Sequence, residues 1–340
     1  MFQHVLVTGG SGFIGSNLVR FLLSQRPDYQ ITNLDALTYA GNPDNLADVA
    51  QHPNYRFVHG NILDRALVES LLSDCDAILH LAAESHVDRS ISDSRPFLES
   101  NVLGTQTLLD AARTVWGSDS SHRFLHVSTD EVYGSLPLDQ PELKFTEATP
   151  IHTSSPYSAS KAASDLLVNA YHQTHGLNTV ITRCSNNFGP YQFPEKVIPL
   201  FVTNLLAGKK VPLYGDGQNV RDWLHVEDHC EALVTVLEGG RAGQVYNIGG
   251  DNERSNLELT HTILDLMGKD VSCIEPVADR PGHDRRYAID ASKIATELHW
   301  QPTRSSWPNA LQLTVDWYCE HVTWSERVRS GAYRSPEMQP

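Results

Sequence analysis

The chain has 340 residues, of which 40% are hydrophobic and 20% are charged. This is the composition of an ordinary globular protein, so it excludes disordered and fibrous chains, and the length allows one large domain or two closely packed ones. The 26 Lys and Arg residues against 41 Asp and Glu residues give a net charge of −15. A protein that coats nucleic-acid phosphates needs the opposite sign, so nucleic acid is excluded as a partner.

No apolar run approaches the roughly 20 residues that a membrane-spanning helix requires. The first residues lead directly into a strand-like run without a basic leader or a cleavage signature, which favours a cytoplasmic protein. The five cysteines are odd in number and lie far apart without a C-x-x-C pair, and the histidines show no ligand spacing. We therefore expect neither a disulfide framework nor a bound metal.

Up to about residue 185, short apolar runs alternate with helix-like segments. The runs lie at residues 5–7, 31–35, 57–58, 77–81, 124–127 and 179–181. This alternation predicts parallel βαβ units in an α/β fold of the Rossmann type, a doubly wound parallel sheet with helices on both faces. Residues 1–185 are predicted to form this dinucleotide-binding domain.

Beyond residue 185 the alternation becomes irregular, and Gly, Pro and Asn become frequent. Helix-like segments at 195–207 and 226–238 and a strand-like run at 245–248 are embedded in loops. We expect residues 186–325 to form mainly a smaller α/β lobe that binds the substrate. The boundary at residue 185 is approximate, because later segments can return to the first lobe. Residues 326–340 are expected to be a weakly ordered tail.

A glycine-rich turn follows the first predicted strand. Gly10, Gly12 and Gly15 form a G-x-G-x-x-G pattern that opens a helix-like segment. Glycines there allow a tight turn and let backbone N–H groups approach a pyrophosphate at the positive end of the helix. Asp35 follows at the end of the next strand, about 20 residues after Gly15, where a carboxylate accepts hydrogen bonds from an adenosine ribose. Together these residues predict a dinucleotide site.

Asp35 also indicates which dinucleotide binds. A carboxylate at this place repels the 2′-phosphate of NADP, and the next residues, Ala36, Leu37 and Thr38, offer no arginine to bind it. NAD is therefore the predicted cofactor.

A second pattern, Y-x-x-x-K at Tyr157 and Lys161, places both side chains on one face of a helix, one turn apart. An ammonium group near the phenol, helped by the positive charge of a nicotinamide, is expected to lower the tyrosine pKa from about 10 towards neutral pH. Tyr157 could then accept a hydroxyl proton while hydride leaves the same carbon. Taken alone, the pattern is common by chance.

The residues after Val127 strengthen the interpretation of the Y-x-x-x-K pattern as catalytic. The apolar run that ends at Val127 is followed by two hydroxyl residues and two carboxylates, Asp130 and Glu131. Strand ends at this edge of an open α/β sheet are where ligands bind. Adjacent residues on a strand point to opposite faces, so both acids can address one substrate only from a loop beyond the strand end. A solvated turn is the alternative interpretation of the acidic pair.

The glycine pattern, Ser128-Thr129, Tyr157 and Lys161 together resemble the extended short-chain dehydrogenase/reductase family. Within it the chain is similar to the nucleotide-sugar 4,6-dehydratases, from about residue 4 to 318. The stretches that carry the resemblance are residues 81–90, 127–134, 183–187, 194–196, 215–223 and 279–287. The related sugar-nucleotide epimerases lack a counterpart of the Asp130-Glu131 pair.

The resemblance implies a hydro-lyase that uses NAD to dehydrate dTDP-glucose to its 4-keto-6-deoxy product. Tyr157, with Lys161, then takes the C4 hydroxyl proton during oxidation, and Thr129 binds the C4 oxygen. Glu131 removes the C5 proton, Asp130 protonates the departing C6 hydroxyl, and the hydride returns to C6. A homodimer is also implied.

The resemblance further implies the contacts of cofactor and substrate. The cofactor residues are Gly9, Gly12, Phe13, Ile14, Gly15, Asp35, Ala36, Leu37, Thr38, Asn61, Ile62, Leu81, Ala82, Ala83, Ser100, Tyr157, Lys161 and Asn187. The residues for the nucleotide sugar are Ser85, Thr129, Asn186, Lys196, Val197, Pro212, Tyr214, Arg221, Asn256, Asp279, Arg280, His283 and Tyr287.

Two residues depart from the family pattern. Asn61 stands where Asp is usual, although an amide oxygen can still accept a hydrogen bond from adenine, and His225 stands where Tyr is usual. Three alternatives stay open. They are the same chemistry on UDP- or CDP-glucose, an epimerase or decarboxylase, and a non-catalytic NAD-binding regulator.

Overall fold

The computed structural model describes residues 2–279 and 282–334, and its centre is a seven-stranded sheet in which every neighbouring pair is parallel. The strand order is β10-β6-β5-β4-β1-β2-β3. The chain therefore turns back between β1 and β4, which is where an open α/β sheet binds ligands. The strands are β1 (His4–Thr8), β2 (Gln30–Asp35), β3 (Tyr55–His59), β4 (Ala77–His80), β5 (Arg123–Thr129), β6 (Thr179–Cys184) and β10 (Val245–Ile248).

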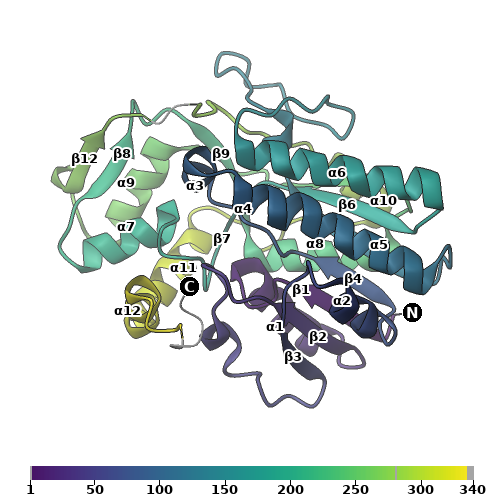
Figure 1. The fold of residues 1–340 in the computed structure, drawn as a ribbon. Coiled ribbons are helices and arrows are strands. Elements are labelled where there is room, and N and C mark those ends of the chain that lie inside the picture. The colour runs from purple at the N-terminus through teal and green to yellow at the C-terminus, as the bar shows by residue number, and fades with distance from the viewer. Residues whose placement is uncertain (1, 280–281, 335–340) are drawn as a thin grey trace.

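Helices cover both faces of this sheet (Figure 1). Val5 and Val7 of β1 pack into one apolar core and Leu6 into the other, as expected for a strand buried on both faces. The first core contains α1 (Phe13–Gln25) and α8 (Val226–Gly239), with α10 (Ser292–Leu298) beside α8. The second contains α2 (Arg65–Leu72), α5 (Thr105–Trp116) and α6 (Pro156–His175). The doubly wound fold predicted from the sequence is confirmed.

The connection between β4 and α5 is largely helical and runs beside α6. It consists of α3 (Val87–Ser92), α4 (Arg95–Phe97) and the π-helix η2 (Leu98–Gly104). Two short 3-10 turns complete this part of the chain, η1 (Pro43–Leu46) after β2 and η3 (Asp130–Tyr133) after β5.

A smaller lobe with its own apolar core follows β6. It has a three-stranded sheet in the order β11-β9-β7 and a parallel pair, β12 with β8. Its strands are β7 (Asn186–Phe188), β8 (Val211–Tyr214), β9 (Val220–His225), β11 (Glu253–Ser255) and β12 (Ile274–Val277). Its helices are α7 (Val197–Leu206), α9 (Asn256–Leu266), η4 (Val271–Cys273), α11 (Asn309–Glu320) and α12 (Val322–Ser330).

Two features differ from the domain division expected from the sequence, one at the boundary near residue 185 and one in the last residues. Helix α8 and strand β10 return to the large sheet, because α8 buries an apolar face on it and β10 pairs with β6. Residues 326–334, expected as part of a weakly ordered tail, contain the last turns of α12 and the buried Tyr333. Their apolar side chains pack against the rest of the protein, which explains the difference. Among the described residues, no helix combines the length and the apolar character needed to cross a membrane.

Candidate active site

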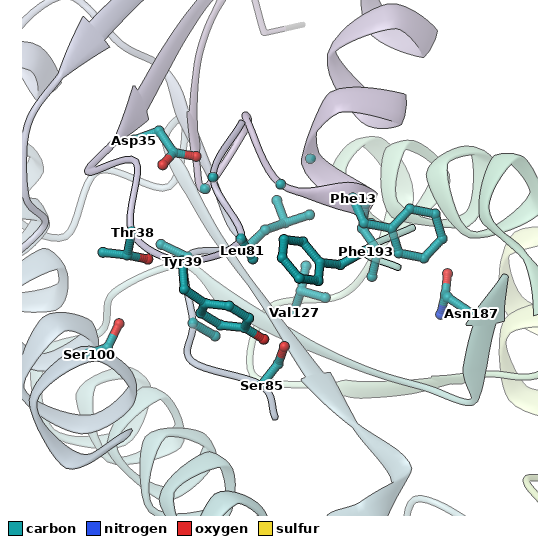
Figure 2. Close-up of a pocket in the computed structure, with 18 of the residues that line it drawn as sticks. Phe13, Asp35, Thr38, Tyr39, Leu81, Ser85, Ser100, Val127, Asn187 and Phe193 are labelled. Carbon is teal, nitrogen blue, oxygen red and sulfur yellow. The ribbon is translucent and has the colours of Figure 1, made fainter. Parts of the chain in front are cut away.

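A cavity of about 340 Å³ lies at the carboxyl ends of the central strands. Its walls come from the loops after β1, β2, β3, β4, β5, β6 and β7, from the first turns of α6 and from α12. Figure 2 shows how side chains from these separate segments face one space, with Asp35 and Thr38 towards one end and Asn187 towards the other. The cavity therefore lies at the place that the strand order favours for a ligand.

The glycine-rich turn after β1 is packed too closely for side chains. Gly9 has φ +72°, and a Cβ added to it would lie 2.7 Å from the backbone of Ala82. A Cβ on Gly15 would lie 2.2 Å from the carbonyl oxygen of Gly9. Gly12, by contrast, would meet only the Gly9 oxygen, at 3.4 Å, and it caps α1 without a side-chain hydrogen bond. The first turn of α1 contains no acidic residue, so its N–H groups can receive a pyrophosphate.

Asp35 at the end of β2 lines the same cavity. Its two carboxylate oxygens accept hydrogen bonds from the backbone N–H groups of Ser11 and Leu37, both at 2.8 Å. Burial raises the pKa of this carboxyl group, and the two N–H donors oppose that rise. The side chain is thus fixed with lone pairs left for ribose hydroxyl groups, which fits NAD.

The other predicted cofactor residues also line the cavity, with one exception. Leu37 is not part of the lining, and its contribution is the backbone N–H that holds Asp35. The amide oxygen of Asn61 accepts the backbone N–H of Leu63 at 2.9 Å, so part of its accepting capacity is already used. His225 lies outside the lining, where its Nδ1 caps α8 by accepting the N–H of Glu227.

Tyr157 and Lys161 lie in the first turns of α6, both buried and both lining the cavity. The helix begins at this place because Ser155 and Ser158 form a capping box and Pro156 occupies the first helical position. Lys161 Nζ donates a hydrogen bond to the carbonyl of Val127 at 2.8 Å. Burial lowers the pKa of Lys161 to about 8.

In the protein without a dinucleotide, the pKa of Tyr157 is raised. Burial raises it well above 10, and the nearby Glu131 and other anionic groups add to the rise, while a hydrogen bond with Thr129 opposes it. Tyr157 is therefore protonated at neutral pH until further positive charge enters the cavity.

The acidic pair follows β5 in the turn η3, beyond the strand end, as predicted. Thr129 ends the strand and caps this turn: its Oγ1 accepts the N–H of Glu131 at 3.2 Å and donates to Asp130 Oδ1 at 3.4 Å. Thr129, Asp130 and Glu131 all line the cavity together with Tyr157 and Lys161. The turn thus brings both carboxyl groups to the ligand space from one short segment.

Asp130 has the properties of a proton donor. Its pKa is raised well above 3.8, mainly by burial and then by the charges of Glu131 and Asp222. Its Oδ2 is buried and has no hydrogen-bond partner among the described residues. Both observations favour the neutral carboxylic acid over the carboxylate, so Asp130 keeps its proton to a higher pH than an ordinary carboxyl group does.

The predicted substrate residues fall into two groups. Ser85, Thr129, Asn186 and Lys196 line the cavity. The second group is found in the smaller lobe, outside that lining, and Arg280 falls outside the described residues. The members of the second group that the structure describes are Val197, Pro212, Tyr214, Arg221, Asn256, Asp279, His283 and Tyr287.

Arg221 links the smaller lobe to the cavity. Its guanidinium lies 4.3 Å from the ring centre of Tyr287 and donates to the carbonyls of Val220 and Asp284 at 2.7 and 3.0 Å. The charge of Arg221 acts on the pKa of Asp130, and that of Glu131 acts on the pKa of Tyr287. This part of the lobe therefore faces the acidic pair.

Several lining residues were not predicted from the sequence. Tyr39 and Phe193 lie next to each other, with ring centres 5.5 Å apart (Figure 2). Trp324 and Val328 come from α12, at the far end of the chain. No local pattern marks these side chains, because only the tertiary fold brings their segments together. The others are Tyr191 and Gln192 in the loop after β7, Cys184 at the end of β6 and Ser185 after it, Leu34 in β2, Ala40, Gly41, Asn42 and Asn45 after β2, Gly60 after β3, and Val127 and Ser128 in β5.

Comparisons with known proteins agree with this site. Residues 6–307 match the family model described as GDP-mannose 4,6 dehydratase. The chain is 50% identical to dTDP-glucose 4,6-dehydratase 1 of Escherichia coli K12, over 98% of this chain and 97% of that protein. It is 53% identical to a dTDP-glucose 4,6-dehydratase of Actinoplanes, over 95% of this chain and 99% of the relative.

Solved structures agree as well. A dTDP-glucose 4,6-dehydratase from Streptomyces venezuelae with NAD bound has a TM-score of 0.91 at 53% identity, covering 96% of this chain and 100% of that one. A UDP-glucose 4-epimerase from Thermus thermophilus in complex with NAD has a TM-score of 0.84 at 30% identity, covering 94% and 100%. The cavity, its Tyr157–Lys161 pair and these similarities together show that the chain belongs to the NAD-dependent nucleotide-sugar epimerase and dehydratase family, among the dTDP-glucose 4,6-dehydratases.

Proposed function

We propose that the protein removes water from dTDP-glucose to give dTDP-4-keto-6-deoxyglucose. The observation that carries the proposal is the turn after β5, which brings Asp130 and Glu131 into one cavity with Tyr157 and Lys161. Oxidation needs only a proton acceptor at the C4 hydroxyl, whereas elimination across C5 and C6 needs a base and an acid as well. The cavity contains all three groups.

The first step takes place at C4 of the sugar. Tyr157 accepts the proton of the C4 hydroxyl, and Thr129 holds the C4 oxygen in place through its hydroxyl group. When bound, NAD supplies the hydride acceptor and later the hydride donor, and its nicotinamide ring adds a positive charge beside the phenol. Lys161, fixed on the carbonyl of Val127, contributes a second positive charge to the same cavity.

A ketone at C4 acidifies the proton on C5. Glu131 removes that proton, while Asp130 donates its own proton to the C6 hydroxyl, which leaves as water. The raised pKa of Asp130 supports this division of roles, because burial and the charge of Glu131 favour the protonated form of its carboxyl group. Glu131 afterwards returns a proton to C5, and Tyr157 keeps the C4 oxygen hydrogen-bonded.

The diphosphate and the base of the substrate belong between the cavity and the smaller lobe. Lys196 lines the cavity and Arg221 lies in β9 behind it, so two cations serve the diphosphate in a protein of net charge −15. The other predicted substrate residues of the smaller lobe are proposed to contact the nucleoside. Similarity to the dTDP-glucose 4,6-dehydratases supports thymine as the base.

Purified protein incubated separately with dTDP-, UDP- and CDP-glucose tests this function. We expect mass spectrometry to show the loss of one water from dTDP-glucose and little change in the other two. Comparable loss from UDP- or CDP-glucose would correct the assignment of the base. No loss from any of them, in protein that holds NAD, would contradict the dehydratase function and favour an epimerase.

We propose that the protein forms a homodimer through α5, α6 and the adjoining η2, which lie together on the outside of the first lobe (Figure 1). Leu103 in η2 and Leu166 in α6 are exposed large apolar side chains on these elements. A second copy of the chain would cover them. Leu166→Lys is expected to shift the mass in light scattering from dimer to monomer, whereas Leu313→Lys, at an exposed Leu in α11, should leave it unchanged. A monomeric parent protein would contradict the proposal.

We also place the protein in the cytoplasm. All five of its cysteines are free thiols, and three of them are buried. Such usage of cysteine suits a reducing compartment.

A further inference from the structure

The C-terminal segment of the described chain, residues 322–334, closes one wall of the cavity that fits NAD. It comprises α12 and the turn after it. Trp324 and Val328 of this segment line the cavity, and Val328 and Tyr333 are buried. In Figure 1, α12 lies next to α11, so a helix that follows the smaller lobe in sequence contributes to a site formed mostly by the first lobe.

A continuous set of hydrogen bonds connects this segment to the glycine-rich turn. Trp324 Nε1 donates to Asn45 Oδ1 at 3.0 Å, and Asn45 Nδ2 donates to the carbonyl of Ser11 at 3.0 Å. The N–H of Ser11 in turn donates to Asp35 at 2.8 Å. Thus α12 is joined through one amide side chain to the two elements that fit the pyrophosphate and the ribose.

The segment also holds the loop after β2, which forms the outer wall of the cavity. Arg327 forms an ion pair with Asp44, with nitrogen and oxygen 2.9 Å apart. The hydroxyl of Tyr333 donates to the carbonyl of Tyr39, and Arg334 donates to the same carbonyl at 3.2 Å. The loop is therefore tied to the C-terminal segment at two places, Tyr39 and Asp44.

The opposite side of Tyr39 is held by the rest of the site. Its ring meets Phe193 edge to face, and the guanidinium of Arg89 lies 4.1 Å from its ring centre. Arg89 also donates to Glu195 at 3.2 Å. Tyr39 is consequently fixed between the C-terminal segment and the loop after β7, directly at the cavity.

We propose that residues 322–334 act as a clasp that retains the dinucleotide, with Trp324 and Val328 as additional residues of the cofactor pocket. Release of the dinucleotide requires the wall formed by the loop after β2 to move, and this movement breaks the bonds to Trp324, Arg327 and Tyr333. The clasp therefore slows dissociation. The inference rests on NAD binding in this cavity and is independent of which nucleotide sugar the protein dehydrates.

The test measures release of NAD from the full-length, NAD-loaded protein, without substrate. Free NAD is destroyed by an excess of an NAD-hydrolysing enzyme, and NAD still bound is quantified at successive times. Trp324→Phe and Tyr333→Phe each remove one hydrogen bond and leave an aromatic ring in place, so we expect release to be about 2- to 10-fold faster for each. Combined with Arg327→Gln, they should accelerate it further, by roughly 10-fold or more.

Arg329→Gln is the matched control, because Arg329 is exposed on the same helix and lies outside the cavity lining. Its release rate should equal that of the parent protein. Circular dichroism establishes that each variant is folded; if the combined variant does not fold, the single variants decide. Release rates unchanged in folded Trp324→Phe and Tyr333→Phe would overturn the clasp. Unchanged release would overturn it even if dehydratase activity were lost.

Discussion

Replacing Tyr157 by Phe is expected to abolish oxidation of the sugar at C4 while the nucleotide sugar still binds. The phenol is buried in the cavity with a hydrogen bond to Thr129, and Lys161 lines the same cavity. General base catalysis typically contributes a factor of about 10² to 10⁴, so kcat should fall by at least that factor with little change in substrate affinity. Rapid quenching and mass spectrometry would show unreacted dTDP-glucose only.

Tyr171→Phe provides the control for this variant. Tyr171 lies on the same helix, and its hydroxyl donates to Asp110 at 2.8 Å, outside the cavity lining. It should therefore retain nearly the activity of the parent protein. Wild-type turnover in Tyr157→Phe would exclude this residue as the base, and a loss of activity in both variants would indicate a structural effect on α6.

Replacing Glu131 by Gln is expected to separate oxidation from elimination. The amide keeps the shape of the side chain but cannot take the C5 proton, whereas the groups acting at C4 are untouched. Quenched samples should contain the hexose oxidised at C4, while dehydrated product forms roughly 10² to 10⁴ times more slowly. Glu142→Gln, at an exposed residue of the loop that follows, is the control and should behave as the parent protein.

Hydrogen exchange distinguishes the two acidic residues. In deuterated water, Asp130→Asn should still exchange the C5 hydrogen, because Glu131 is intact, but it should lose the C6 hydroxyl slowly. Glu131→Gln should show neither exchange nor efficient elimination. C5 exchange at the parent rate in Glu131→Gln would contradict its assignment as the base, and rapid elimination in Asp130→Asn would contradict that of the acid.

The parts of the site that were predictable from the sequence are those formed by short segments. The glycine-rich turn, Asp35 and the Y-x-x-x-K pattern depend on local backbone geometry and helical spacing, and all line one cavity. The place of Asp130 and Glu131 beyond the strand end followed from the alternation of side chains along a strand. The Rossmann-type sheet followed from the alternation of strands and helices.

The remaining parts depend on tertiary contacts that no local pattern encodes. Trp324 reaches the cavity only because α12 folds back onto the loop after β2, and Tyr39 meets Phe193 across a large separation in sequence. In the protein without a dinucleotide the pKa of Tyr157 is raised, which the sequence could not predict, because it shows the neighbouring lysine but not the degree of burial or the approach of Glu131. Burial is a property of the complete fold.

The return of β10 to the large sheet affects how the protein can be made. While a ribosome is still synthesising the smaller lobe, β6 is an edge strand, and its free backbone groups are open to pairing with another chain. The sheet is complete only after residue 248 has emerged, because β10 is the strand that covers this edge. The first lobe therefore cannot finish folding before much of the second has been synthesised, and the growing chain is exposed to aggregation during that interval.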